Sequence, residues 1–272
     1  MHHAPMTTAA RVLVTLDRGV ARVSLHRPDK RNGLDLEMFE GLLVAGERVA
    51  SERGVRAVVL SGEGKAFCAG LDWAAFLAAG PAVRDRLLDR APGRPGNLAQ
   101  RICWIWQEIP VPVIAAVHGV AFGGGLQLAL GADIRIVAPD ARLSVMEIRY
   151  GLVPDMGITK TLLGLVRPDV ARELTFTGRI VGGEEAVRLG LCTRVADDPL
   201  AEALALAREI AARSPEAIRA AKKLYQEAAG RDTAAAFELE TATQITLLGT
   251  PEQMEAAMAT LERREPVFGE PG

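Results

Sequence analysis

Apolar positions along the chain change their spacing several times, and each change predicts a new element of structure. Short runs that are apolar or alternate in polarity predict strands at 11–25, 56–62, 111–119 and 133–145, the first and last of these as pairs. Apolar residues at three- and four-residue spacing predict helices at 35–51 and 98–108, with further helices starting near Asp72 and within GGGLQLALGAD.

Helical patterning takes over in the last part of the chain. Segments rich in Ala, Leu, Glu and Arg end at Pro or Gly, which predicts helices at 199–213, 215–229, 232–247 and 251–263. Alternating strands and helices followed by helices alone indicate an α/β fold. We therefore divide the chain into a core, 1–198, and a helical region, 199–272. The final helices would bury their apolar faces poorly by themselves, which favours oligomerisation.

The segment 80–97 interrupts this pattern. It is rich in Pro, Gly and Arg, and such residues punctuate regular structure. We interpret it as a mobile excursion from the core that shapes a binding pocket.

The overall composition is that of a globular protein of ordinary charge. The chain has 272 residues, is 49% hydrophobic and carries a formal charge of −2, which gives no indication of nucleic-acid binding. No apolar run approaches the roughly 18 residues of a membrane span, and MHHAPMTTAA at the start lacks the apolar centre of a signal peptide. Three scattered cysteines form neither a disulfide framework nor a zinc motif, so a reduced, cytoplasmic setting fits.

Two glycine-containing loops are the most informative feature of the sequence. AFCAGLD (66–72) and GVAFGGGLQ (119–127) each follow a strand-like run and open a helix-like one. Backbone N–H groups at such a junction can face a developing negative charge, and two of them on one oxygen form an oxyanion hole. Tight turns with no binding role explain the same glycines equally well on spacing alone. The loops match neither the dinucleotide fingerprint, nor the P-loop, nor the nucleophile elbow.

Four segments together resemble the enoyl-CoA hydratase/isomerase (crotonase) family, and they extend over nearly the whole chain. They are RPDKRNGL (27–34), AFCAGLD (66–72), PVIAAVHGVAFGGGLQLALGADIRI (112–136) and LSVMEIRYGLVPDMG (143–157). The resemblance implies a spiral of repeated ββα units with a C-terminal helical region that assembles trimers, often stacked into hexamers. It also implies an acyl-CoA thioester as the bound partner, and neither a metal nor a redox cofactor.

The resemblance also implies which residues meet the thioester. Matched position by position, the two oxyanion donors fall on the backbone N–H groups of Leu71 and Gly124, and Gly124 suits close approach of the substrate because it has no Cβ. The same matching makes Lys30 a CoA contact. It assigns further substrate or CoA contacts to four residues of the first loop, namely Ala66, Ala69, Gly70 and Asp72.

Three side chains bear on which reaction follows. Glu147 matches a catalytic glutamate of the family. Gln127 stands where family hydratases carry a second glutamate, and an amide cannot accept and return a proton at neutral pH. Asp155 stands where many hydratases have glycine, but where dienoyl-CoA isomerases have a catalytic aspartate and aryl-CoA dehalogenases a nucleophilic one. An alternative role for Asp155 is to cap a helix beginning near Met156.

This combination favours an enzyme that isomerises the double bond of an unsaturated fatty acyl-CoA, a 3-enoyl or 3,5-dienoyl thioester. Glu147 is then the principal acid/base, Asp155 a second proton-transfer group, and Gln127 a hydrogen-bonding partner of substrate or water. A 2-enoyl-CoA hydratase is the main alternative, and a decarboxylase, hydrolase or dehalogenase of the same superfamily is a lesser one. A non-catalytic oligomer that binds acyl-CoA is the hypothesis from a different class.

A few other side chains have less specific interpretations. His118 reads as a core or pocket-lining histidine, and Cys68 as a small apolar filler within the first loop. Aromatic residues that could line an acyl pocket, or simply pack in the core, are Trp73, Phe76, Trp104 and Trp106.

Overall fold

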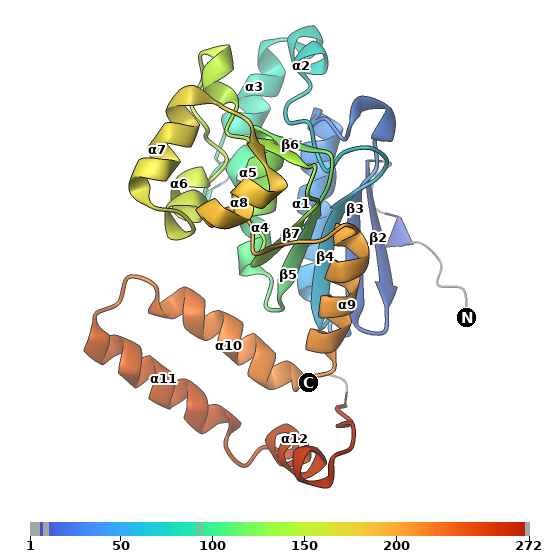
Figure 1. The fold of residues 1–272 in the computed structure, drawn as a ribbon, viewed down its shortest axis with the longest axis vertical. Coiled ribbons are helices and arrows are strands. Elements are labelled where there is room, and N and C mark those ends of the chain that lie inside the picture. The colour runs from blue at the N-terminus through green and yellow to red at the C-terminus, as the bar shows by residue number, and fades with distance from the viewer. Residues whose placement is uncertain (1–5, 8–10, 91, 94, 270–272) are drawn as a thin grey trace.

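A seven-stranded sheet forms the centre of the molecule (Figure 1). The computed structural model describes residues 6–7, 11–90, 92–93 and 95–269. The strands of this sheet are Met6–Thr7 (β1), Val12–Asp17 (β2), Val20–Leu25 (β3), Ala57–Gly62 (β4), Val113–Val117 (β5), Ile134–Val137 (β7) and Arg194–Val195 (β10). They lie in the order β1-β2-β3-β4-β5-β7-β10, parallel from β3 onward, with antiparallel pairing only between β1, β2 and β3.

The predicted hairpin at the start of the chain is confirmed. β2 and β3 pair antiparallel from Val12 opposite Leu25 to Asp17 opposite Val20. The two residues between them, Arg18 and Gly19, both have positive φ, at 47° and 79°. Two such residues match the right-handed twist of the flanking strands, which is why a two-residue loop closes the hairpin here.

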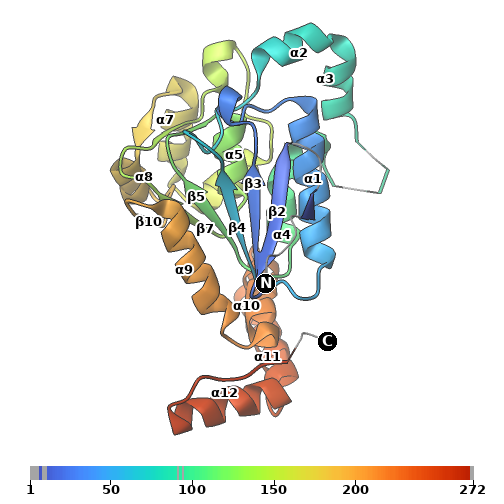
Figure 2. The ribbon, with the colours of Figure 1, turned by 90° about the vertical axis from the view of Figure 1, so that its right-hand side faces the viewer.

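Helices cover both faces of the sheet (Figure 2). Leu36–Ser51 (α1) and Leu98–Glu108 (α4) lie on one face, and Pro199–Ala211 (α9) lies on the other. Strand β4 shows the consequence, because Val58 and Leu60 join the cluster under α1 and α4 whereas Ala57 and Val59 join the cluster under α9. A strand buried on both faces is apolar at nearly every position, as 56–62 was predicted to be.

The strand–strand–helix unit recurs along the chain, as expected. After β2, β3 and α1, the next such unit consists of β5, Val120–Phe122 (β6) and Gly124–Leu130 (α5). A third consists of β7, Arg142–Ser144 (β8) and the 3₁₀ turn Glu147–Tyr150 (η2). β6 was not predicted separately. Gly119, with φ of 60°, turns the chain there out of the main sheet and into a smaller one of order β6-β8-β9, in which β9 is Val181–Gly182.

The segment 80–97 is more regular than its composition indicates. Trp73–Ala79 (α2) is followed directly by Pro81–Leu88 (α3), so the first part of 80–97 is helical, while the mobility of the segment stays a prediction. Gly80, with φ of 73°, makes the sharp turn between the two helices, and proline is favoured at the first position of a helix. Of the remainder, residues 91 and 94 lie outside the described residues, and Asn97 caps α4.

Short helices connect the second sheet to the C-terminal region. They are Ile158–Thr161 (α6), Leu162–Gly164 (η3), Pro168–Thr177 (α7) and Gly183–Leu189 (α8). A further 3₁₀ turn, Pro28–Lys30 (η1), precedes α1. The predicted final helices are confirmed within two residues at each end, as α9 followed by Pro215–Ala228 (α10), Thr233–Leu247 (α11) and Pro251–Glu262 (α12).

The last three helices extend beyond the sheet at one end of the molecule (Figure 1). α10 is anchored by Lys222, whose Nζ donates to Asp133 Oδ2 and to the carbonyl oxygens of Trp106 and Val111 over 2.8–2.9 Å. α11 packs along α10 and has no buried residue. The division of the chain at residue 198 stays a prediction. α9, the first helix after that boundary, packs on the sheet, whereas the later helices extend beyond it.

Candidate active site

The two glycine-containing loops lie side by side at the point where the chain leaves the main sheet and enters β6. Cys68 N donates to Val120 O over 3.0 Å, and Phe122 N donates to Cys68 O over 3.1 Å. Gly70 allows this approach, because a methyl group on its Cα would lie 2.5 Å from Phe122 O and its φ is 83°. The structure thus joins two loops that the sequence placed far apart.

Each loop contributes one free backbone donor to a shared cavity. Leu71 and Gly124 both line a cavity of about 500 Å³. Within the described residues, neither of their N–H groups has an acceptor, whereas the flanking Asp72 N donates to Leu34 O. Gly124 is the first residue of α5, where an N–H has no partner inside the helix. The pair can therefore serve one oxygen of a bound molecule.

Gly124 is also closely packed, which the sequence did not reveal. A methyl group on its Cα would lie 2.8 Å from Met156 Sδ and 2.9 Å from Leu34 Cδ1. A larger residue at this position would therefore have to displace the ends of those two side chains.

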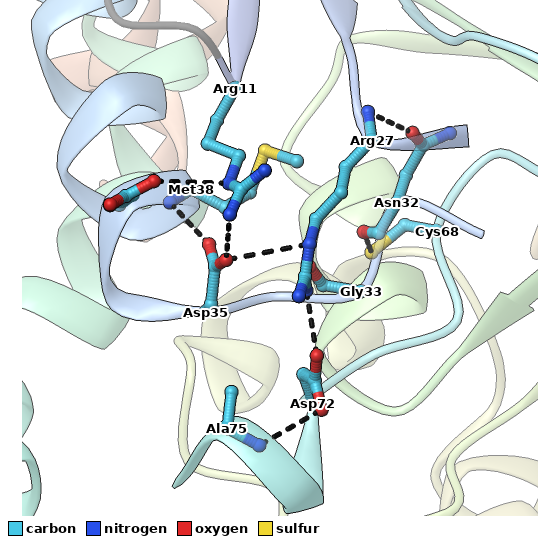
Figure 3. A network of polar contacts seen from close by, with 10 residues as sticks. Arg11, Arg27, Asn32, Gly33, Asp35, Met38, Cys68, Asp72 and Ala75 are labelled. Atoms are coloured by element: carbon cyan, nitrogen blue, oxygen red, sulfur yellow. Dashed lines mark hydrogen bonds and ion pairs between the residues drawn. The ribbon is translucent and has the colours of Figure 1, made fainter. Parts of the chain in front are cut away.

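A network of partly buried charges holds the first loop from behind (Figure 3). Asp72 caps α2 by accepting from Ala75 N over 3.1 Å, and it also accepts from Arg27 Nη1 over 2.7 Å. These contacts hold the pKa of the Asp72 carboxyl below its ordinary value, with the backbone hydrogen bond as the largest cause. Arg27 reaches on to Asp35, the N-cap of α1, at 3.5 Å. One arginine therefore joins the starts of two helices.

Asn32 ties the same segment to the loop through its side chain. Its amide nitrogen donates to the carbonyl oxygens of Ala66 and Glu63 over 2.8 and 2.9 Å, and its amide oxygen accepts from Arg27 N over 2.9 Å. Asn32 is fully buried and has φ of 55°, a conformation that asparagine tolerates better than most residues. The RPDKRNGL motif thus acts as a support for the oxyanion loop.

Glu147 faces the same cavity from η2. Its Oε1 accepts from Gln127 Nε2 over 2.6 Å, while its Oε2 is buried and has no hydrogen-bond partner among the described residues. Burial raises the pKa of this carboxyl above its ordinary value, and the charge of Asp155 adds to the shift while the Gln127 hydrogen bond opposes it. A carboxyl with a raised pKa holds its proton to a higher pH than an ordinary glutamate, which suits a group that takes up and returns a proton.

Asp155 also lines the cavity, but it does not cap the next helix. The N-cap of α6 is Gly157, and no side chain bonds to the start of that helix, so the capping alternative is wrong. The Asp155 side chain is accessible to solvent, yet its pKa is raised, mainly by desolvation from the surrounding chain. It is therefore a second titratable group facing the cavity that contains Glu147.

The rest of the cavity wall is largely apolar. Of the four aromatic residues left open between pocket and core, Trp73 and Phe76 line the cavity. Trp106 is buried in the core with its Nε1 donating to Ile102 O, and Trp104 is not on the wall. Trp73 also packs on Tyr150 of η2, with ring centroids 4.9 Å apart. Several wall residues were not predicted. Phe39, Arg84 and Leu87 lie in no motif, whereas Tyr150, Leu152 and Val153 lie within the 143–157 segment but were given no role there.

The residues predicted for the site fall into two groups. Ala69 and Gly70 line the cavity together with the two oxyanion donors and the two carboxylates. Lys30, Ala66, Asp72 and Gln127 are not on its wall. Lys30 is exposed in η1, Ala66 is buried, and Asp72 belongs to the support described above. Their substrate contacts stay predictions.

His118 and Cys68, the two less specific candidates, both lie away from the cavity wall. His118 Nε2 lies 3.0 Å from Gly64 O and does not reach the cavity wall. Cys68 is fully buried with its thiol donating to Asn32 O over 3.1 Å, and burial raises the pKa of this thiol to about 12. A thiol in that state is a packed side chain and not a nucleophile.

The described residues offer neither a metal site nor a membrane-spanning helix. No cluster of three or more His, Cys, Asp or Glu side chains with the geometry to hold a metal ion occurs among them. Within the same residues, no helix combines the length and the apolar character that crossing a membrane requires.

Two free amides and two carboxyl groups around one apolar cavity define an acid–base site for a substrate that develops charge on oxygen. Comparison with known proteins agrees with this class. The family model for enoyl-CoA hydratase/isomerase matches residues 15–271. The chain therefore belongs to the enoyl-CoA hydratase/isomerase family.

Individual relatives are named either as hydratases or as isomerases. The protein named "Probable enoyl-CoA hydratase EchA14" from Mycobacterium tuberculosis is 41% identical over 78% of this chain and 79% of its own length. The mitochondrial Delta(3,5)-Delta(2,4)-dienoyl-CoA isomerase of Homo sapiens is 31% identical over 93% of this chain and 79% of its own length. The crystal structure of an enoyl-CoA hydratase from Bacillus anthracis superposes with a TM-score of 0.87 at 30% identity, covering 96% of this chain and all of that one. These likenesses confirm the crotonase fold.

Proposed function

We propose that this protein isomerises the double bond of an unsaturated fatty acyl-CoA, a 3-enoyl or 3,5-dienoyl thioester. The observation that carries the proposal is the identity of the ionisable groups on the cavity wall. Glu147 and Asp155 both face the cavity, whereas position 127 holds an uncharged amide that lies behind the wall. Two separate carboxyl groups suit proton removal at one carbon and proton return at another.

The oxyanion loops supply the electrostatic part of the reaction. In this proposal the thioester oxygen accepts from the N–H groups of Leu71 and Gly124, which have no other acceptor within the described chain. Removing the proton from C2 leaves an electron pair that delocalises onto this oxygen as an enolate. Each such donor typically lowers the barrier by about 2.7–4 kcal/mol, because it is already oriented before charge develops.

Proton transfer then moves the double bond. In its ionised form Glu147 takes the C2 proton of a 3-enoyl thioester, and the resulting dienolate is protonated at C4, so the double bond shifts to C2–C3. A 3,5-dienoyl thioester follows the same sequence with protonation at C6. Asp155 returns or orients the second proton from its own position on the wall. This reaction conserves electrons, so it calls for no redox cofactor, and we propose that it also proceeds without a metal.

The CoA part of the substrate is assigned by family resemblance. Lys30 is exposed in η1, beside the support of the oxyanion loop, and a cation there would meet the CoA phosphates or adenine. Ala66, Ala69, Gly70 and Asp72 complete the proposed binding segment. We also propose a cytoplasmic location, which agrees with three free cysteines that are all buried.

A 2-enoyl-CoA hydratase is the second candidate function. The names of several relatives favour it, including the 41% identical protein from M. tuberculosis. Hydration by this chain would require Glu147 to activate water with the help of Asp155, because Gln127 cannot exchange protons. A non-catalytic acyl-CoA-binding oligomer would instead bind thioesters and turn none over.

Product analysis separates these functions. Wild-type protein and Gln127→Glu are each incubated with 2-enoyl-, 3-enoyl- and 3,5-dienoyl-CoA, and the products are identified by mass and retention time. Double-bond migration without water addition by the wild type supports the isomerase. Efficient hydration of 2-enoyl-CoA by the wild type, lost in Glu147→Gln, would establish the hydratase instead. Binding of all three thioesters with no product would support the non-catalytic oligomer.

We further propose a homotrimer or a dimer of trimers. The support lies in the last three helices, where large apolar side chains are exposed, including Phe237, Ile245, Leu248 and Leu261 at 60–79% of their full area. Large apolar side chains that are exposed in one part of a chain fit an interface between subunits. Light scattering coupled to size-exclusion chromatography tests the proposal, and a monomer at micromolar concentration would contradict it.

A further inference from the structure

Gln127 lies directly behind Glu147, and protein groups occupy both ends of its side chain. Its Nε2 donates to Glu147 Oε1 over 2.6 Å, and its Oε1 accepts from Met156 N over 2.8 Å. Only 1% of the residue is exposed. The sequence favoured substrate or water as its partner, but the structure places Gln127 between two segments of the chain that both reach the cavity.

The backbone fixes the orientation of this amide. An N–H group can only donate, so the partner of Met156 N must be the oxygen of the Gln127 side chain. The amide nitrogen then has to face Glu147. As a result, Oε1 of Glu147 is held as a hydrogen-bond acceptor, whereas Oε2 is buried without a partner. An unpaired buried oxygen favours the protonated form of its carboxyl, so Oε2 is where the proton resides.

The same amide links Glu147 to the neighbour of Asp155. Met156 follows Asp155 in the chain, so one side chain ties η2 to the segment that carries the second carboxyl group. Met156 is itself buried beside Gly124, which makes this segment a fixed part of the site. Displacing Gln127 would therefore move both acid–base groups relative to the two oxyanion donors.

A carboxylate at position 127 would behave differently. One oxygen could still accept from Met156 N, but the other would lie 2.6 Å from Glu147 Oε1 if the geometry were kept. Two carboxylates at that distance cannot both be ionised, so they would share one proton and titrate as a pair. The amide avoids this coupling and leaves Glu147 with a single proton to exchange.

We propose that Gln127 is a positioning residue that fixes which oxygen of Glu147 carries the proton. It also holds Glu147 in a fixed position relative to Asp155. The inference rests on the proposed isomerisation for its catalytic consequence. It rests only on the side-chain geometry for its effect on the Glu147 carboxyl. The two parts can therefore be tested separately.

The geometric part is tested without substrate. The pKa of Glu147 is measured by ¹³C NMR of its side-chain carboxyl in wild type, Gln127→Met and Gln127→Glu, with Glu147→Gln used for assignment. Gln127→Met removes the donor at nearly the same volume, so the pKa of Glu147 should rise. Gln127→Glu retains the acceptor for Met156 N and should show two coupled titrations. A Glu147 pKa equal to that of the wild type in both variants would overturn the inference.

The catalytic part is tested on a thioester that the wild type isomerises. Gln127→Met should lower kcat by about 10- to 100-fold with KM little changed, because a small misplacement of the base costs rate and not binding. It should also move the acidic limb of the pH–rate profile upward. Gln107→Met is the matched control, because it removes a glutamine hydrogen bond to Gly131 O outside the cavity. Equal kcat and pH profiles for Gln127→Met and wild type would contradict the catalytic part. If the wild type isomerises no thioester, the proposed function fails while the NMR result still decides the geometry.

Discussion

The Arg27 guanidinium donates to Asp72 Oδ2 over 2.7 Å, and both side chains are at most 15% exposed. This contact joins the segment before α1 to the residue that caps α2 (Figure 3), one position after Leu71, the proposed oxyanion donor. The position of Leu71 N is therefore set partly by a charged pair that is not on the cavity wall.

Replacing Arg27 by Met should loosen the oxyanion loop. A hydrogen bond to a charged group contributes about 1.5–3 kcal/mol, so the free energy of unfolding should fall by that amount. kcat should fall with it, because Leu71 N is no longer held. Urea unfolding and steady-state kinetics measure the two effects. Arg18→Met is the matched control, because the Arg18 ion pair with Asp17 is largely exposed and should contribute nothing measurable. Wild-type kcat in Arg27→Met would show that the loop needs no such support.

Replacing Gly70 by Ala should abolish activity for steric reasons. The new methyl group would meet the backbone oxygen of Phe122, which cannot move without disturbing β6. We expect kcat to fall by about 10²-fold or more, as for loss of an oxyanion donor. Gly249→Ala is the control, because its φ of 79° is similar but no atom lies within 4 Å of the added methyl group. The control should lose only about 1–2 kcal/mol of stability from the unfavourable φ. Equal activity in both variants would rule out the clash.

Replacing Lys222 by Met should detach α10 from the core. The Lys222 ammonium is 6% exposed, and removing it leaves Asp133 and two carbonyl oxygens without their cation. Breaking a buried ion pair from one side costs about 3–5 kcal/mol, so the melting temperature should drop clearly. The adjacent Lys223 is 74% exposed, and Lys223→Met should melt like the wild type. A drop of equal size in both variants would contradict the anchoring role.

Replacing Glu147 by Gln should stabilise the protein more at neutral than at acidic pH. The folded pKa of Glu147 is raised above its ordinary 4.5, so the folded chain binds a proton that the unfolded chain has released between those two values. The wild type therefore loses stability as the pH rises through that window, whereas the amide does not titrate. Thermal unfolding at pH 4 and pH 7 measures the difference between variant and wild type. A difference that does not grow toward pH 7 would show that ionisation of Glu147 does not destabilise the folded protein.

Much of the architecture could be predicted because it depends on local patterns. The β2–β3 hairpin follows from alternation around a turn, and the helices after residue 198 follow from periodicity and proline breaks. The two glycine-containing loops could be located between a strand and a helix, whereas their role as an oxyanion hole stays a prediction. The segment 81–88 could not, because the Pro, Gly and Arg that suggest a loop also serve as the first turn and solvent-facing positions of α3.

The parts of the site that were missed depend on tertiary contacts. No pattern in the sequence shows that Gln127 bridges Glu147 and Met156, since the three residues come from α5, η2 and the segment before α6. Asp155 looked like a helix cap because it stands just before a helical pattern, but the helix begins later and Gly157 takes that place. The residues of α3 that line the cavity belong to no recognisable motif. They reach the cavity only because of where α3 packs.

Because Cys68 pairs with β6, we expect the loops that carry Leu71 and Gly124 to be completed late in folding. Leu71 and Gly124 acquire their positions only when the first loop, the RPDKRNGL support and the second sheet have all come together. Contacts so distant along the chain form slowly relative to local helices. During refolding, turnover should consequently return after helical circular dichroism has recovered, which makes enzyme activity a sensitive reporter of the last stage of folding.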